Sequence, residues 1–212
     1  MYKNDNFELI EKMYKKIDEC LLFDDVPSKR LRVLSENQMF KMYPFSLLLE
    51  LKNTKQTPEH HPEGNVWNHT LMVVDKAAEL KSRSSTPRVF MWASLLHDIG
   101  KAKTTKIRNG RITAYDHDKL GARLAEDFLN ELSEDKEFVR KVKMLVNYHM
   151  QILYVSKGLP FQDIAGTKRN TDIQELSFLA YCDRLGRIGA DIEEEREQVQ
   201  VFLDKLSSDG FD

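Results

Sequence analysis

An adjacent histidine and aspartate, His97-Asp98, stand at the end of an apolar segment that reads as a helix beginning at Pro87. Both side chains carry metal-binding atoms, and side by side they can chelate one ion. Four further residues of the right kind lie at wide intervals, each on or beside a segment that also reads as helix: His69, His117, His149 and Asp183. Imidazole and carboxylate ligands without thiolate suit a divalent transition metal that activates water. A fold that uses all of them must bring several helices together.

Apolar residues recur at helical spacing along most of the chain, which predicts an all-α protein. The expected helices span residues 7–22, 29–40, 45–51, 66–81, 87–98, 119–132, 136–148, 172–188 and 192–206. A small hairpin or extended loop is predicted near 104–114, with its turn at Asn109-Gly110. Gly100 is expected to terminate the preceding helix. Three large aromatic residues fall at core spacing and are predicted to be buried rather than to stack on bases: Trp67, Trp92 and Phe178.

The chain of 212 residues is 41% hydrophobic, which is enough for one core. We expect a metal-binding helical domain over 46–190, an N-terminal helical extension over 1–45 that packs on it, and a C-terminal helix over 191–212. The acidic run 191–197 is interpreted as a solvated helix face. Nothing in the sequence indicates the oligomeric state.

Charge and cysteine content narrow the range of partners. The 32 basic and 34 acidic residues give a formal net charge of -2, so no large basic field predicts nucleic acid as an obligate partner. A small or locally bound anionic substrate fits better. The two cysteines form neither a disulfide framework nor a zinc motif. With no secretory signal at the N-terminus and no apolar run of ~20 residues, we expect a soluble cytoplasmic protein without a membrane partner.

Each candidate ligand also has an ordinary structural interpretation. A lone histidine on a helix is more often a core or surface residue than a ligand, and only the joint pattern of all the candidates favours a metal. Asp183 lies in the apolar run 176–183, where burying a carboxylate without a cation is costly. The alternative to a metal there is a salt bridge to Arg184 or Arg187.

The order His69, His97-Asp98, Asp183 resembles the HD superfamily of metal-dependent phosphohydrolases. Several spaced segments are also similar to the HD domain of bacterial CCA-adding tRNA nucleotidyltransferases: 57–70, 97–101, 117–122, 146–150 and 183–187. The resemblance covers residues 43–187, and it implies an HD-domain helical bundle.

Departures from related groups restrict the expected activity. The CCA-adding enzymes carry a nucleotidyltransferase head with a glycine-rich turn and an Asp-x-Asp pair, which this sequence lacks, so we expect the HD portion alone and no CCA addition. Guanosine tetraphosphate hydrolases follow the His-Asp pair with a Glu-Asp pair, whereas residues 99–102 read Ile-Gly-Lys-Ala. Cyclic-dinucleotide phosphodiesterases show a double histidine before a glutamate and a Gly-Tyr-Pro motif, whereas His149 is single and precedes Met150-Gln151.

The resemblance implies a ligand set for one or two ions. One metal would be held by His69, His97, Asp98 and Asp183. His117 and His149 would complete a second site, with Asp98 as the bridge. Histidine-rich ligation suits Mn, Fe, Co, Ni or Zn better than Mg, which nevertheless stays possible.

Asp98 and Lys101 are the predicted catalytic residues. Lys101 lies one turn beyond Asp98, where its charge could neutralise a phosphate oxygen or steady the leaving group; the alternative is a solvated lysine favourable to a helix dipole. The substrate-binding candidates are His61, Lys101, Arg184 and Arg187. Either arginine can instead orient Asp183, and His61 can be an ordinary loop residue.

Three hypotheses for function follow. The first is a metal-dependent phosphohydrolase acting on a nucleotide or another small phosphate ester. The second is a 2′,3′-cyclic phosphodiesterase or RNA-end phosphatase, which makes RNA a possible partner. The third is a non-catalytic HD module that binds a nucleotide or a protein. Metal content separates the first two from the third, and comparison of monoester with cyclic diester substrates separates the first from the second.

Overall fold

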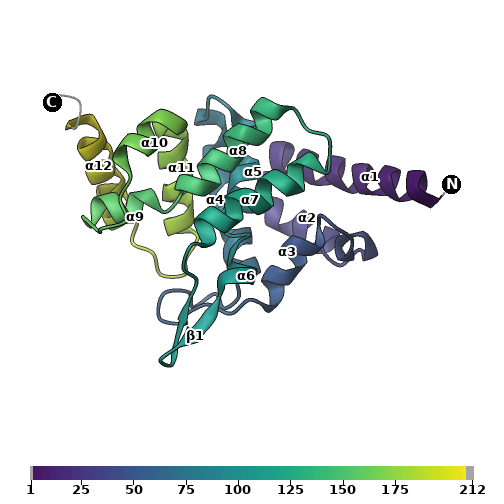
Figure 1. The fold of residues 1–212 in the computed structure, drawn as a ribbon, viewed down its shortest axis with the longest axis horizontal. Helices are drawn as coiled ribbons and strands as arrows, with labels where there is room; N and C mark the ends of the chain where they lie inside the picture. Colours follow the sequence, from purple (N-terminus) through teal and green to yellow (C-terminus); the bar gives the residue numbers. More distant parts are fainter. Residues whose placement is uncertain (1, 209–212) are drawn as a thin grey trace.

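The computed structural model describes residues 2–208, with side chains from residue 7 onward. It confirms an all-α bundle with one small hairpin (Figure 1). The helices that build the bundle are α4 (Val66–Leu80), α5 (Pro87–Leu96), α7 (His117–Asn130), α8 (Lys136–Tyr148) and α11 (Ile173–Leu185). Helices α7 and α8 run side by side, α5 packs on α4 and α8, and α11 crosses α4. Residues far apart in sequence therefore meet at one end of the bundle.

Helix α8 illustrates how the sequence specifies the bundle. Its buried residues recur every three or four positions, which puts an apolar stripe on the side that faces the core. Asp135 caps the helix, because its carboxylate accepts hydrogen bonds from the backbone N–H groups of Glu137 (2.9 Å) and Phe138 (3.1 Å). The three aromatic residues predicted to be buried are buried: Trp67, Trp92 and Phe178.

The N-terminal region wraps one side of the bundle with α1 (Tyr2–Phe23), α2 (Pro27–Leu34), η1 (Gln38–Lys41), α3 (Ser46–Glu50) and η2 (Leu51–Asn53). Helix α1 packs on α5, and α2 packs on α4. The single helix predicted over 29–40 is wrong. Ser35 Oγ donates to the carbonyl of Arg32, and the Asn37 side chain caps a separate 3₁₀ turn. The domain boundaries at 45 and 190 stay predictions.

The predicted hairpin is confirmed. Strands β1 (Lys106–Arg108) and β2 (Arg111–Thr113) pair in antiparallel register and project from the bundle, after the short helix α6 (Lys101–Thr104). Asn109 and Gly110 form the turn with φ angles of 49° and 76°. Positive φ at both central residues is the geometry for which Asn-Gly is selected in two-residue hairpins.

The C-terminal region contains two short helices that the sequence did not predict, α9 (Gln151–Ser156) and α10 (Ile164–Asn170), and also α12 (Ile192–Ser208). The link after α4 forms η3 (Lys81–Arg83). Helix α12 packs on α9 and α11. The predicted C-terminal helix extended to residue 212, and 209–212 lie outside the described residues. Among the described helices, none combines the length and apolar character needed to cross a membrane.

Candidate metal centre

The fold brings the six predicted ligands into one buried cluster. His69 comes from α4 and Asp183 from α11, while His97 and Asp98 occupy the turn that ends α5. The other two stand at helix ends, at the start of α7 and just after α8: His117 and His149. None of the six is more than 7% exposed. Three helices and the turns that follow α5 and α8 thus supply side chains to one cluster.

The four histidines are held in the same way. In each, the ring Nδ1 lies within hydrogen-bonding distance of a backbone carbonyl oxygen. For three of them the carbonyl belongs to the residue three positions earlier, at 2.7–2.9 Å: His97, His117 and His149. Because a carbonyl only accepts, Nδ1 of these three rings carries the hydrogen, and in the neutral imidazole Nε2 keeps its lone pair. A backbone contact of this kind orients a metal-binding histidine.

Asp98 divides the cluster into two groups. Its Oδ2 lies 3.3 Å from Nε2 of His97 and 3.7 Å from Nε2 of His69. Its Oδ1 lies 3.4 Å from Nε2 of His117 and 3.8 Å from Nε2 of His149. We call His69, His97 and Asp183 the His69 group, and His117 with His149 the His117 group. One carboxylate therefore faces both groups, with a different oxygen toward each.

The His69 group contains a second carboxylate and is supported by a third. Asp183 Oδ1 lies 2.9 Å from Nε2 of His69, and Arg187 lies 3.7 Å from the same oxygen. On the other side of the ring, Glu63 Oε1 lies 3.1 Å from His69 Nδ1 and 2.8 Å from His61 Nδ1. From the sequence, Glu63 was a loop residue that could line the substrate pocket or have no special role, and nothing predicted that it would contact His69, six residues later.

Glu63 lies in a loop whose two ends are held together. Lys55 and Asn65 form an isolated β-bridge, which closes the loop between them. The Asn65 side chain also caps α4 by accepting from the N–H of Asn68 at 2.9 Å. The loop carboxylate is thereby fixed relative to the first turns of the helix that carries His69.

Two glycines allow the helices to approach closely at the cluster. A Cβ on Gly100 would lie 2.1 Å from the carbonyl oxygen of His117 and 2.7 Å from the backbone N of Gly121. A Cβ on Gly186 would lie 2.5 Å from a methyl group of Val73 on α4. Gly100 follows the turn that ends α5 and directly precedes α6, and its φ of -70° is not the left-handed conformation of a helix-ending glycine. Any side chain at this position would collide with the backbone of α7, so only glycine fits. The close contact brings Asp98 toward His117.

Electrostatics differ between the two groups. Burial alone would raise the pKa of Asp98, but Lys101, 2.7 Å away, and His97 hold it well below its usual range. Burial also disfavours a charged His69, yet the hydrogen bonds that its ring donates to Asp183 and Glu63 raise its pKa. In the His117 group burial and the neighbouring imidazoles lower the pKa of His149 to about 4. The surroundings of His69 therefore favour its protonated form, whereas those of His149 favour the neutral imidazole.

The donor set fits a divalent transition metal. His97 Nε2 is buried and makes no hydrogen bond to any described residue, and the adjacent Asp98 Oδ2 has only the ammonium of Lys101, at 2.7 Å, as a charged partner outside the cluster. Orphaned polar atoms of this kind are uncommon in proteins, since burying them unpaired costs free energy. Here both belong to a convergent set of imidazole nitrogens and carboxylate oxygens in which three-residue groupings lie within ligand distance of one another. Nitrogen and oxygen donors without thiolate suit Mn, Fe, Co, Ni or Zn.

The predicted substrate residues fall in two places. His61 and Lys101 line a cavity of about 470 Å³ that also reaches the ligand His117. The alternative of a solvated Lys101 does not hold, because its side chain is 15% exposed and also donates to Gln56 Oε1 at 2.9 Å. Arg187 stays beside Asp183. Arg184 instead is buried and ion-paired with Glu195 of α12.

That ion pair corrects part of the sequence interpretation. The run 191–197 was expected to be a solvated face, but Glu195 is partly buried against Arg184. Arg184 therefore ties α12 to α11, next to the ligand Asp183.

The rest of the cavity is largely apolar and aromatic. Its lining includes Tyr154, Phe161 and Leu159 from the α9–α10 region and Ile112 from the hairpin. The sequence analysis named none of them, because α9 and α10 are too short to give a clear periodic signal. A mostly apolar hollow with a few polar groups at one end is typical of small-molecule sites, which run from about 300 to 1,000 Å³.

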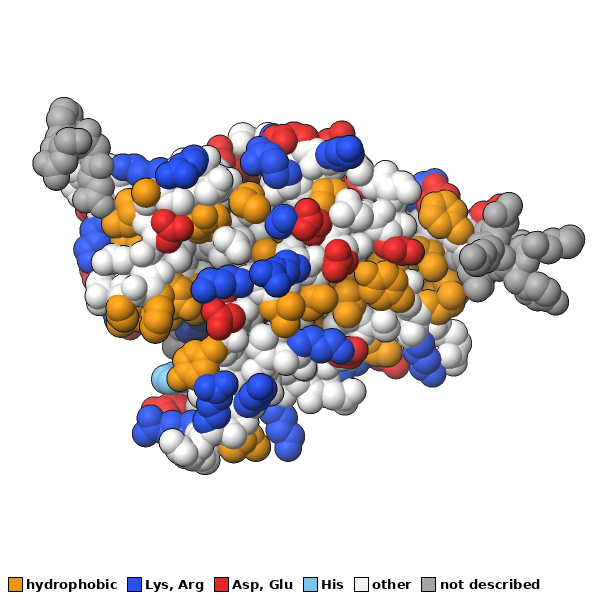
Figure 2. All heavy atoms as spheres, in the orientation of Figure 1, with side chains coloured by type: hydrophobic (Ala, Val, Ile, Leu, Met, Phe, Trp, Pro, Cys, Tyr) orange, Lys and Arg blue, Asp and Glu red, His pale blue; other side chains and the backbone are white. Residues whose placement is uncertain are grey.

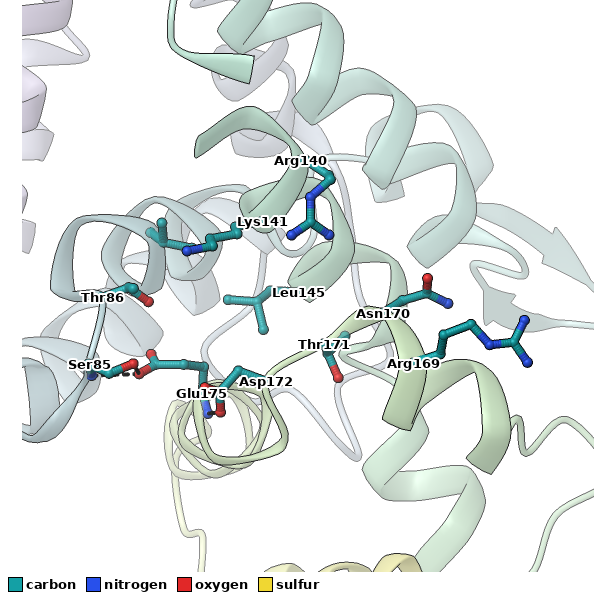
Figure 3. A pocket seen from close by; sticks show the side chains of 11 residues that line it. Ser85, Thr86, Arg140, Lys141, Leu145, Arg169, Asn170, Thr171, Asp172 and Glu175 are labelled. Carbon is teal, nitrogen blue, oxygen red and sulfur yellow. Dashed lines mark hydrogen bonds between the residues drawn. The ribbon is translucent and has the colours of Figure 1, made fainter. Parts of the chain in front are cut away.

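A second cavity, of about 320 Å³, lies away from the predicted ligands (Figure 3). Glu175 points toward the start of α5, where its carboxylate accepts hydrogen bonds from Ser84 Oγ (2.7 Å) and from Ser85 N (2.7 Å) and Oγ (3.0 Å). Its buried charge is thus already satisfied by the protein. The same hydrogen bonds link α11 to the start of α5. Among the described residues that line this cavity, none has a buried polar side-chain atom without a hydrogen-bond partner.

Comparisons with known proteins agree with this geometry. A family model described as HD domain matches residues 66–188. The Multifunctional CCA protein of Actinobacillus pleuropneumoniae is 29% identical over 157 residues, which are 71% of this chain and 37% of the relative. The protein of the same name from Methylococcus capsulatus is 30% identical over 183 residues, 82% of this chain and 40% of the relative. The match thus spans well under half the length of these relatives.

Proposed function

The chain belongs to the HD domain family, and from this premise we propose that it is a metal-dependent phosphohydrolase that cleaves a phosphate ester of a nucleotide or a related small molecule. The observation that carries the proposal is Asp98, whose two oxygens face two separate histidine groups. This arrangement favours two ions with Asp98 as their bridge. The ligands would be His69, His97 and Asp183 for one ion, and His117 and His149 for the other.

A divalent transition metal held there would acidify a water molecule and offset charge on phosphoryl oxygens. The protein contributes the orientation of the ligands. Backbone carbonyls fix the imidazole rings through Nδ1, and Glu63 braces His69 from behind. Because the cluster is buried, these groups do not need to reorganise when a substrate enters.

Lys101 is proposed as the residue that handles charge on the substrate. The Lys101 ammonium contacts Asp98 Oδ2, and the same residue lines the cavity. Lys101 therefore links the cluster to the cavity in which a phosphate would bind. There it can neutralise a non-bridging oxygen or steady the leaving group as negative charge develops. We expect Lys101→Met to lower kcat/KM by about 10²–10³ while circular dichroism stays unchanged.

The cavity supports a nucleotide-sized substrate. Its lining combines the polar side chains of Lys101, His61 and His117 with the aromatic rings of Tyr154 and Phe161. A phosphate against the first set and an aromatic base against the second would use both kinds of surface. His61 and Arg187 are proposed to help hold the phosphate, His61 from the cavity wall and Arg187 from beside Asp183.

The test combines metal content with turnover. Protein purified without a nickel column is subjected to elemental analysis, and the same sample is assayed on phosphomonoesters, nucleotides and 2′,3′-cyclic nucleotides with added Mn, Co, Ni or Mg. About two equivalents of a transition metal with turnover support the proposal. Bound metal without turnover on any substrate, or no metal at all, overturns it and favours a non-catalytic binding module.

A further inference from the structure

A basic groove runs along the other side of the hairpin from the cavity. The segment 101–114 carries five basic residues and no acidic one, although acidic residues outnumber basic ones in the whole chain. Lys and Arg side chains gather over the projecting hairpin at the bottom of Figure 2. Between the hairpin and α7 lies a hollow of about 460 Å³, and its basic lining residues are Lys103, Lys106, Arg108, Lys119 and Arg123.

Three of these cations are not neutralised by the protein. Lys103 pairs with Glu50 at 2.8 Å, and Lys119 pairs with Asp116 at 3.1 Å. Lys106, Arg108 and Arg123 are exposed, and none has a carboxylate within 4.0 Å among the described residues. An ordinary solvated surface intersperses charges of both signs. A row of unpaired cations inside a groove instead matches an extended anion.

Tyr115 links the groove to the cavity. It lines both hollows, and the residue is 62% exposed. The Arg108 guanidinium lies 5.2 Å from the ring centroid, a cation–π contact. Within the cavity Phe161 is 68% exposed. Exposed aromatic rings beside a positively charged track are the features by which proteins hold unpaired bases and the backbone that joins them.

We propose that this groove binds the sugar–phosphate backbone of a single-stranded polynucleotide whose terminal nucleotide enters the cavity. The inference rests on the proposed function for the identity of the scissile ester, but the binding itself does not require turnover. A duplex fits less well, because its bases are paired inward and cannot reach the Tyr115 ring. A mononucleotide would leave the three unpaired cations unused.

The test measures binding rather than activity. A fluorescein-labelled single strand of about twelve nucleotides with a free 3′-hydroxyl, as RNA and as DNA, is titrated against the full chain by anisotropy at about 50 to 200 mM salt. The variant is Lys106→Gln/Arg108→Gln/Arg123→Gln. The control, Lys12→Gln/Lys16→Gln/Lys29→Gln, removes the same charge from exposed positions on α1 and α2.

We expect the groove variant to weaken binding at low salt about tenfold or more, and to reduce the slope of log K against log salt by about 2, which is ~0.7 for each phosphate contact of a single strand. The control variant should match the parent protein. Equal affinity for RNA and DNA would assign recognition to the backbone, and a preference for RNA would add a 2′-hydroxyl contact. Either result supports the groove.

Three results would overturn it. One is equal weakening by both variants, which would show only the loss of net charge. Another is an oligonucleotide that binds no better than a mononucleotide. The third is a groove variant that no longer binds vesicles of phosphatidylcholine and phosphatidylglycerol but binds the oligonucleotide as the parent protein does. That result would assign the hairpin and its exposed Ile107 to a membrane surface. Oligonucleotide binding by a protein that turns over none of the phosphomonoesters, nucleotides and 2′,3′-cyclic nucleotides tested above would support the groove and refute the proposed hydrolysis, so the two failures are distinct.

Discussion

The two histidine groups are built from similar ligands but are supported differently. In the His69 group, side chains surround the ring: Asp183 on Nε2 and Glu63 near Nδ1. In the His117 group, the two rings lie 3.3 Å apart at Nε2 and depend on backbone carbonyls and on one oxygen of Asp98. The pKa of His69 is raised, whereas burial lowers the pKa of His117.

This difference indicates how each group accepts a cation. Carboxylates around His69 carry negative charge that a metal would neutralise. The His117 group is nearly neutral and presents two imidazole lone pairs to one another, an arrangement that is unfavourable unless a cation or proton lies between them. We therefore expect the His69 group to bind its ion more tightly.

The largest effect should come from the residue that the groups share. Asp98→Ala removes the oxygen facing each group, and we expect it to abolish binding of both ions and to lower kcat/KM by about 10³. The far-ultraviolet circular dichroism should stay that of a folded helical protein. Asp127→Ala, at an exposed position on α7, is the control. Retained turnover in Asp98→Ala would refute the shared-ligand mechanism.

Single histidine variants should separate the two ions. His149→Gln is expected to release the ion of the His117 group and leave about one equivalent bound, and His69→Gln to release the ion of the His69 group. Elemental analysis and isothermal titration report the stoichiometry. His60→Gln, an exposed loop histidine outside the ligand set, should bind as the parent does. If His149→Gln leaves the metal content unchanged, the His117 group is not a metal site.

Glu63 offers a narrower test of the side-chain support. Glu63→Gln keeps the shape of the side chain but removes the charge beside His69 Nδ1, and we expect about 10–100-fold weaker metal binding in the His69 group alone. Metal titration followed by calorimetry measures the two affinities. Glu59→Gln alters an exposed carboxylate in the same loop and should have no effect. Equal weakening of both affinities would show that the groups are not independent.

The smallest effects should come from the two close-packed glycines. Gly100→Ala places a methyl group against α7, and Gly186→Ala places one against Val73 on α4. Each should lower the free energy of unfolding by about 1–3 kcal/mol through overpacking, measured by denaturant titration. The first should weaken the ion of the His117 group and the second that of the His69 group. The reverse assignment would contradict the division proposed for the cluster.

The sequence alone determined the class of the fold and indicated which residues are candidate ligands. Helical spacing predicted most of the long helices because burial of one face leaves a periodic record in the chain. The Asn109-Gly110 turn was predictable because both residues need a positive φ, a local requirement. The six ligands were recognisable by residue type and order, and the fold brings all of them together.

Other features were decided only by the tertiary structure, because they depend on contacts between segments distant in sequence. Gly100 looked like a helix terminator, yet its reason is the backbone of His117 across the bundle. Arg184 was a candidate for binding phosphate or orienting Asp183, and only the fold shows that it pairs with Glu195 on α12. A net charge of -2 concealed a local row of unpaired cations, since composition sums over the surface and the fold concentrates charge. Likewise, only packing could turn the two oxygens of Asp98 toward two different pairs of imidazoles.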